Sequence, residues 1–342
     1  MTTQVPGGAW GLGLRVVLLA VAVGLAACAL PGDRGQSSRI PSDRVYRIGV
    51  APWMMDKPQK KSVEVFLAVL EKSGYSAKAN LEIKVDDAAG NERVQEQIIR
   101  DFVDWNADLI YVLSAQGALI AQETAKDIPI VFSGVGYPQE LGLVERLEFS
   151  GNQMVGVRSY VPVEEQMAFL GRLVSQDIRR LGVCFRTDDD DSRLFLDEIR
   201  ALASKQGIAL MRIEAQDAGS FRRLLAQEGP GADALYLGCD DLMQGAGAAV
   251  AVDFAAPRGI PILSCGSNAV SKGALAGAVV DEEQSAQLAA GHAIQILDGR
   301  RPTSLQTLTV STPRLLVNSG AARALRIRMP QVFMGEEVHV IE

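Results

Sequence analysis

Four consecutive aspartates in the stretch FRTDDDDSR (residues 185–193) form the densest group of ionisable side chains in the chain. Two further acidic pairs, Asp240-Asp241 and Glu282-Glu283, also follow short apolar runs. Such carboxylates suit a metal ion, a cationic solute or the N-termini of helices. Calcium is disfavoured because the run lacks the D-x-D-x-D-G spacing and distal Glu that let one loop surround a hard cation. We therefore predict no metal site, and no cofactor is implied.

The chain offers little material for catalysis. Only two histidines are present, His292 and His339, and they are too far apart in the sequence for helical metal-ligand spacing. Ser114 and Ser133 follow apolar runs without a G-x-S-x-G elbow. A formal net charge of −7, without clustered Lys or Arg, argues against a nucleic-acid surface. We predict that the protein is not an enzyme and binds no nucleic acid.

The elements that must position these residues form an internal repeat. From Val45 onward, short apolar runs alternate with helix-period segments, which predicts parallel sheets covered by helices on both faces. ADLIYVL at 107–113 matches ADALYLG at 232–238, and IPIVFSG at 128–134 matches IPILSCG at 260–266. The predicted fold class is therefore α/β, with two similar Rossmann-like lobes.

Parallel α/β sheets bind ligands beyond the carboxyl ends of their strands, so two facing lobes would enclose a cleft. The loops after the predicted strands supply the candidate ligand-binding residues, which are Trp53, Met54, Ser114, Ala115, Gln116, Ser133, Gly134, Tyr137, Arg186, Asp188, Ser192, Asp240, Asp241, Ser267, Asn268 and Glu282. Eight carboxylates in the three acidic groups would face this cleft. Because like charges repel at close range, their convergence favours a cationic guest.

Each acidic group also precedes a predicted helix, where carboxylates cap free N–H groups, so the cap interpretation stays open beside the ligand interpretation. We expect Asp190 and Asp191 to be caps, and Arg186, Asp188 and Ser192 to contact ligand. Arg186 is expected to neutralise its aspartate neighbours rather than bind a ligand anion.

Two aromatic side chains and two serines complete the predicted cleft chemistry. Trp53 and Tyr137 are expected to lie over an ammonium group, a contact that contributes ~0.5–2 kcal/mol. Helix N-termini after Ser114 and Ser133 would offer N–H groups to a carboxylate. A zwitterion and a cationic amine are both compatible with this set.

Three cysteines, Cys184, Cys239 and Cys265, lie near the carboxyl ends of neighbouring predicted strands. A disulfide between two of them, or a soft-metal site, is one interpretation in an oxidising compartment. We favour the other, in which they are small apolar residues in buried strands.

Residues 1–27 are interpreted as a lipoprotein signal peptide. Arg15 precedes the 12-residue apolar run VVLLAVAVGLAA, which is shorter than the ~20 helical residues that span a bilayer. The run ends in Leu-Ala-Ala-Cys, which resembles the bacterial lipobox, so Cys28 is the expected lipidation site. A non-cleaved anchor or ordinary secretion signal is the alternative, and the protein is expected to be exported either way. Residues 28–44, rich in Pro, Gly, Ser and charge, are predicted to be a flexible tether.

Several ordered motifs carry a family resemblance, namely Gly74-Tyr75, GVRSYVPVEEQ at 156–166, KGALAG at 272–277, ILDGRRP at 296–302 and LLVNSGAARALRIRMPQ at 315–331. From about Val45 to the C-terminus, the chain resembles the type I periplasmic solute-binding proteins of ABC importers. Within them it is most similar to the subfamily that includes tryptophan-binding lipoproteins. Arg186 and Asp191 stand where Asn is common in that family, so charge replaces amide chemistry in a ligand-binding loop.

The resemblance implies a monomeric, membrane-anchored periplasmic or cell-surface protein that captures an amino acid or amine-bearing compound. Lobe closure would trap the solute for an ABC permease and ATPase complex. A ligand-sensing module for a membrane signalling partner is the alternative function. The implied hinge crossings lie near residues 155–160, 275–280 and 303–312. The implied lobes are residues 45–158 with about 277–303, and residues 159–276 with about 304–342.

Overall fold

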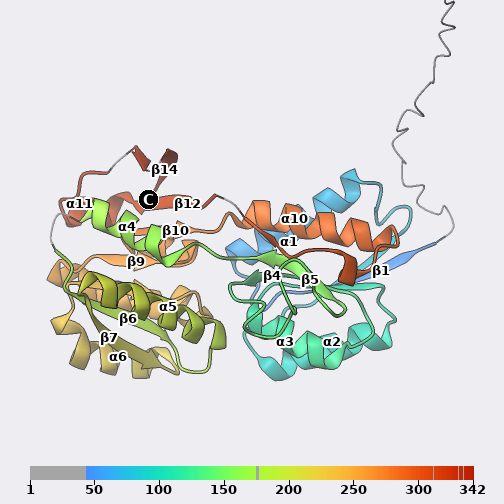
Figure 1. Cartoon of the computed structure of the whole chain (residues 1–342), viewed down its shortest axis with the longest axis horizontal. Helices are drawn as coiled ribbons and strands as arrows, with labels where there is room; N and C mark the ends of the chain where they lie inside the picture. The colour runs from blue at the N-terminus through green and yellow to red at the C-terminus, as the bar shows by residue number, and fades with distance from the viewer. Residues whose placement is uncertain (1–43, 175–176, 311, 330, 334) are drawn as a thin grey trace, which may run out of the picture. The chain divides into compact units, whose positions relative to one another are not determined.

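The computed structural model describes residues 44–174, 177–310, 312–329, 331–333 and 335–342. These residues form two mostly parallel sheets with helices packed against them (Figure 1). The predicted lipidation site Cys28 and the signal peptide lie outside the described residues, as does the tether up to residue 43. Within the described part of the chain, no helix is both long and apolar enough to cross a membrane.

The first sheet has the strand order β11-β5-β4-β3-β1-β2, and all of its neighbouring strands run parallel. β3 shows why the sheet is covered on both faces, because all four of its residues, LIYV, are buried. The strands are β1 (Tyr46–Ala51), β2 (Leu81–Val85), β3 (Leu109–Val112), β4 (Ile130–Val135), β5 (Met154–Arg158) and β11 (Leu308–Thr309).

The second sheet has the order β13-β14-β12-β10-β9-β8-β6-β7. The neighbouring strands β10, β9, β8, β6 and β7 run parallel to one another. In contrast, β12 pairs antiparallel with β10, and β13 pairs antiparallel with β14. The strands are β6 (Arg180–Arg186), β7 (Ala209–Ala215), β8 (Ala234–Leu237), β9 (Ile262–Ser264), β10 (Ala276–Val279), β12 (Arg314–Asn318), β13 (Val332–Phe333) and β14 (Glu336–Ile341).

Helices cover both faces of each sheet, and successive strand residues divide between two cores. In β3, Leu109 and Tyr111 join the cluster under α1 and α10, while Ile110 and Val112 join the cluster under α2 and α3. On the second sheet, α4, α5 and α11 cover one cluster, and α6 to α9 contribute to the other.

The helices of the first sheet are α1 (Lys57–Lys72), α2 (Glu92–Asp104), α3 (Ala115–Thr124) and α10 (Glu282–Leu297). Those of the second sheet are α4 (Val163–Leu173), α5 (Asp190–Gln206), α6 (Ala218–Glu228), α7 (Asp241–Gln244), α8 (Ala246–Ala255), α9 (Ser267–Ser271) and α11 (Ser319–Ala324). Each sheet with its helices is called the first or second lobe below.

The predicted repeat is confirmed by the strand order. The first lobe contains the order β2-β1-β3-β4-β5, and the second lobe contains the corresponding order β7-β6-β8-β9-β10. The matched sequence pairs form β3 and β8, and β4 and β9. The predicted α/β class with two parallel sheets is therefore also confirmed.

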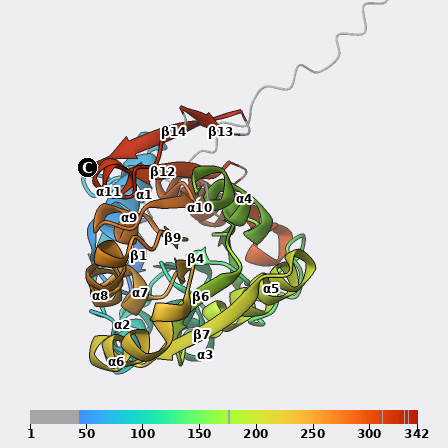
Figure 2. The same ribbon diagram turned by 90° about the vertical axis from the view of Figure 1, so that its left-hand side faces the viewer.

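The chain passes between the sheets three times, after β5, after β10 and after β11. The third crossing falls within the hinge range expected at 303–312, but later than the lobe boundary expected at about residue 304. Leu308 and Thr309 still pair with β5 in the first sheet, so the chain leaves the first lobe only after residue 309. Figure 2 shows the second lobe facing the viewer, with β14 and β12 beside α11.

Candidate ligand-binding site

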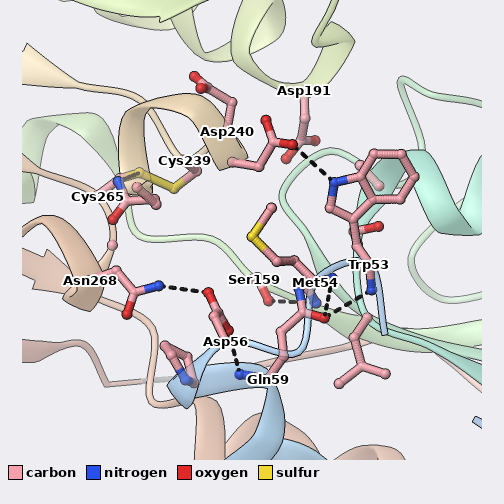
Figure 3. Close-up of a pocket in the computed structure, with 18 of the residues that line it drawn as sticks. Trp53, Met54, Asp56, Gln59, Ser159, Asp191, Cys239, Asp240, Cys265 and Asn268 are labelled. Carbon is pink, nitrogen blue, oxygen red and sulfur yellow. Dashed lines mark hydrogen bonds between the residues drawn. A yellow bond between two sulfur atoms is a disulfide. The ribbon is translucent and has the colours of Figure 1, made fainter. Parts of the chain in front are cut away.

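A cavity of about 310 Å³ lies where strands of both lobes end. Its lining residues come from the ends of β1, β3, β4, β5, β6, β8, β9 and β10 with the loops that follow them, and from the starts of α1, α2, α3 and α10 (Figure 3). The volume is at the lower end of the ~300–1,000 Å³ typical of small-molecule sites. The cavity therefore has the position that the fold class predicts for a ligand and the size of a small solute.

Most of the predicted site residues line this cavity. They are Trp53, Met54, Ser114, Ala115, Gln116, Ser133, Gly134, Arg186, Asp188, Asp240, Asp241, Ser267, Asn268 and Glu282. Tyr137 and Ser192 are not part of the lining and are both buried elsewhere. Their predicted ligand contacts do not fit the observed cavity, because the hydroxyl of Tyr137 donates to Glu198 and that of Ser192 donates to Asp240.

Helix α3 supplies an anion-binding end to the cavity. Ser114 is its N-cap, and its hydroxyl oxygen accepts a hydrogen bond from the N–H of Gly117 at 2.9 Å. The first N–H groups of a helix have no intrahelical acceptor, and here Ala115 and Gln116 face the cavity. The prediction of a second helix N-terminus after Ser133 is wrong, because Ser133 lies within β4.

The aspartate run is arranged differently from the prediction. Asp189 is the N-cap of α5 and accepts from the N–H of Ser192 at 2.6 Å, so Asp190 and Asp191 are not the caps. Asp190 instead pairs with Arg193 on the exposed face of the same helix. Asp191 reaches the first lobe, where its carboxylate accepts the N–H groups of Gly136 and Tyr137, each at 3.0 Å.

Arg186 is held between two carboxylates. Its guanidinium binds Asp188 at 2.7 Å and both carboxylate oxygens of Asp241, at 2.9 and 3.0 Å. The negative neighbours raise the pKa of Arg186, and Arg186 lowers the pKa of Asp188. Asp241 also accepts the indole N–H of Trp53 from the first lobe at 3.2 Å. These groups are therefore largely satisfied by one another.

Glu282 is the exception among the cavity carboxylates. Its side chain has no hydrogen bond or ion pair within the described residues, although it lines the cavity at the first turn of α10. Burial and, after it, the nearby negative charge of Asp56 raise the pKa of Glu282 to about 7, although Arg314 acts in the opposite direction. A half-buried carboxylate without a partner is the feature of the cavity that most strongly attracts a cation.

Asp56 lines the cavity but is not among the residues predicted from the sequence, although the order Asp-Lys-Pro is a typical start of a helix. It caps α1 by accepting from the N–H of Gln59 at 3.0 Å. Its second oxygen accepts from the amide of Asn268 in the second lobe at 2.6 Å (Figure 3). Asp56 therefore belongs to both the cavity and the contact between the lobes.

A disulfide joins Cys239 and Cys265 at the cavity wall (Figure 3). The favoured interpretation of all three cysteines as free apolar residues is therefore wrong for this pair, while Cys184 is buried and free. The bridge connects the loops after β8 and β9. Gln244 ties the same loops together, because its amide donates to the carbonyl of Gly238 and the hydroxyl of Ser264.

In the described part of the chain, no three His, Cys, Asp or Glu side chains are grouped to hold a metal ion.

Comparisons with known proteins place this fold and cavity in a functional context. A model of the ABC transporter substrate binding protein family matches residues 47–340. A tyrosine-binding protein from Clostridioides difficile strain R20291 is 25% identical over 290 residues, which is 85% of this chain and 84% of that protein.

Solved structures show the same fold. A conserved domain protein from Vibrio cholerae has 25% identity and a TM-score of 0.78, covering 84% of this chain and 97% of its own. A Streptococcus pneumoniae domain in complex with L-Trp has 20% identity and a TM-score of 0.80, covering 87% of this chain and all of its own.

The disulfide can be tested by replacing both Cys239 and Cys265 with serine in a chain that begins at residue 29. The bridge closes a loop with a sequence separation of 26 residues, so we expect the free energy of unfolding to fall by about 2–4 kcal/mol. In the unfolded chain that begins at residue 29 and keeps both cysteines, thiol titration should find one free thiol without reductant and three free thiols with reductant. Three free thiols without reductant would contradict the bridge.

The pH dependence of stability tests the buried carboxylates. Burial raises the pKa values of Asp191, Asp240 and Glu282 to about 7 from 3.8, 3.8 and 4.5. Between about pH 4 and 7 the folded chain then holds protons that the unfolded chain has lost, so stability falls as pH rises. Urea unfolding of the ligand-free protein at pH 5, 6, 7 and 8 should show this decrease, with a shallower slope in Glu282→Gln. A rise in stability over this range would contradict the assignment.

Proposed function

Because the chain belongs to the family of ABC transporter substrate-binding proteins, we propose that it captures a free amino acid between its lobes and delivers it to an ABC importer. The observation that carries the proposal is the pairing of an anion-binding helix end with one unpartnered carboxylate in the same cavity. A zwitterion carries the complementary charges on a single small molecule.

The carboxylate of the ligand is assigned to the N-terminus of α3. The N–H groups of Ala115 and Gln116 lie at this end, and helix N-termini favour negative charge. Ser159 lines the same cavity and accepts the N–H of Gly134 at 3.0 Å, which leaves its own O–H to donate. These donors together suit a carboxylate without requiring a ligand-binding arginine.

The ammonium group of the ligand is assigned to Glu282. The aspartate run is occupied by N–H groups and by Arg186, so it offers less free charge than its sequence suggests. Glu282 lines the same cavity as Ala115 and Gln116, and its charge contributes to the raised pKa of Tyr111, after the larger effect of burial. The hydroxyl of Tyr111 in turn is 2.8 Å from that of Ser133 on the cavity wall. The cavity thus offers N–H donors to the carboxylate of an α-amino acid and a carboxylate acceptor to its ammonium group.

The side chain of the ligand would occupy the apolar part of the cavity. Trp53, Met54, Leu113, Val279 and Val280 contribute apolar surface to the lining. One relative is named as a tyrosine-binding protein, and one structural neighbour was solved with L-Trp. Both of those ligands share the zwitterionic head group assigned here, which supports an α-amino acid as the ligand class.

The proposal describes a receptor rather than a catalyst. No histidine lines the cavity in the described residues, and the hydroxyl oxygen of Ser114 is engaged by the N–H of Gly117. We therefore propose no covalent catalysis, which requires a nucleophile with an adjacent base. We further propose that the Leu-Ala-Ala-Cys motif directs acylation of Cys28, since several acyl chains at about 0.8 kcal/mol per buried CH₂ would hold the receptor at a membrane surface.

Replacing Glu282 by glutamine tests the ammonium assignment. Loss of a charge-assisted hydrogen bond should weaken binding by about 10- to 100-fold in calorimetric titrations with L-tyrosine and L-tryptophan. Glu283→Gln is the matched control, because Glu283 is exposed, pairs with Lys61 at 3.9 Å and does not line the cavity. Equal affinities in the two variants would refute the role of Glu282.

The ligand class is tested by a thermal-shift screen of the parent protein against the common amino acids and simple amines. A true ligand at 100 times its dissociation constant adds about 2.7 kcal/mol to the free energy of unfolding. Stabilisation by amino acids with free ammonium and carboxylate groups is expected, and their N-acetyl and methyl ester derivatives should have smaller effects. Absence of stabilisation by every amino acid would contradict the proposed function.

A further inference from the structure

Helix α5 of the second lobe carries two carboxylates that reach the first lobe. Asp191 and Glu198 are seven residues apart, so they lie on the same side of the helix, two turns from each other. Both contact the loop that follows β4. Asp191 accepts the N–H groups of Gly136 and Tyr137, and Glu198 accepts the hydroxyl of Tyr137 at 2.6 Å.

The acceptor face of α5 meets a loop that is already held in place. The side chain of Arg158, at the end of β5, donates to the carbonyl of Gly136 at 2.7 Å. Its guanidinium also lies 3.8 Å from the ring centroid of Tyr160 in the crossing between the lobes. Tyr160 packs edge-on against Tyr137 with centroids 5.7 Å apart, and its hydroxyl also donates to Glu198. Glu198 therefore accepts hydrogen bonds from the hydroxyls of Tyr137 and Tyr160 beside the first crossing between the lobes.

The contact between Tyr137 and Glu198 differs in position from the other bonds between the lobes, whereas Asp191 and Gly136 line the cavity. Trp53 with Asp241, and Asp56 with Asn268, join residues that line the cavity, where a solute would sit. Tyr137 and Glu198 are not part of that lining. The bond between them joins the two lobes without any ligand atom.

We propose that Tyr137 and Glu198 form a latch that holds the lobes together outside the ligand cavity, beside the Asp191 contact at the cavity wall, and thereby sets affinity and residence time. This inference rests on the proposed function as a solute receptor. The apparent dissociation constant of a receptor rises when its binding-competent form is less populated, so a bond made only in the closed form strengthens binding of every ligand equally. The latch thus governs affinity, whereas the cavity governs selectivity.

The chemistry of the pair suits this role. Burial and the adjacent carboxylate of Glu198 raise the pKa values of Tyr137 and Tyr160, so both phenols keep their protons and act as donors at neutral pH. A neutral donor on a carboxylate gives a stronger bond than two neutral partners, and only one charge has to be accommodated. The tyrosine ring also buries its apolar body, since only 8% of Tyr137 is exposed.

Tyr137→Phe tests the latch because it removes one hydroxyl and keeps the ring. In the ligand-free, full-length protein, amide hydrogen exchange at residues 136 and 137 should become faster, and small-angle scattering should report a larger radius of gyration. L-Tyrosine and L-tryptophan should both dissociate about tenfold faster, in an unchanged order of affinity. Glu198→Gln is the second variant and should act in the same direction.

Asp197→Asn is the matched control. Asp197 neighbours Glu198 on α5, but its side chain is 69% exposed and pairs with Arg200 on the same helix. It should leave ligand-free exchange and dissociation rates as in the parent. Unchanged exchange and dissociation in Tyr137→Phe and Glu198→Gln would overturn the latch. If these variants open the ligand-free protein as expected while no amino acid binds the parent, the latch stands and the proposed function fails instead.

Discussion

The structure depends on how buried negative charge is compensated. Carboxylates from both lobes converge on one cavity, and like charges at such separations destabilise the closed form unless each finds a donor. Asp189 and Asp240 use the N–H groups of helix starts, and Arg186 neutralises its neighbours. Asp191 uses N–H groups of the opposite lobe. Compensation of charge and closure of the lobes are therefore one process.

This constraint assigns different roles to residues that look equivalent in the sequence. The aspartates of the run form hydrogen bonds and ion pairs within the second lobe and with the first lobe. Most of their charge is therefore compensated by protein groups in the absence of a ligand. Glu282 enters from α10, a helix that packs on the first lobe but follows a strand of the second. Its carboxylate has no protein donor within the described residues, so in the proposed binding mode it is available to the solute. In the proposed mode, separate carboxylates therefore recognise the ligand and join the lobes.

Much of the fold could be predicted because the repeat and the buried apolar strands are local patterns. The positions of the cleft loops followed from the parallel strands, and this brought Trp53, Ser114 and Asp241 to the cavity. Partners across the lobes could not be predicted in this way. The contact of Asp191 with residues 136 and 137, and the pairing of Cys239 with Cys265, depend on how segments distant in sequence approach one another. A run of identical aspartates contains no local signal that tells which of them caps the helix, which forms an ion pair and which contacts the other lobe.

The central claim is that a zwitterion is held between the N-terminus of α3 and Glu282. A crystal structure of the protein grown with L-tyrosine or L-tryptophan tests it most directly. We predict an α-ammonium nitrogen within hydrogen-bonding distance of the Glu282 carboxylate and an α-carboxylate at the N–H groups of Ala115 and Gln116. An ammonium group bound instead to Asp188 or Asp241, with Glu282 still unpartnered, would contradict the account.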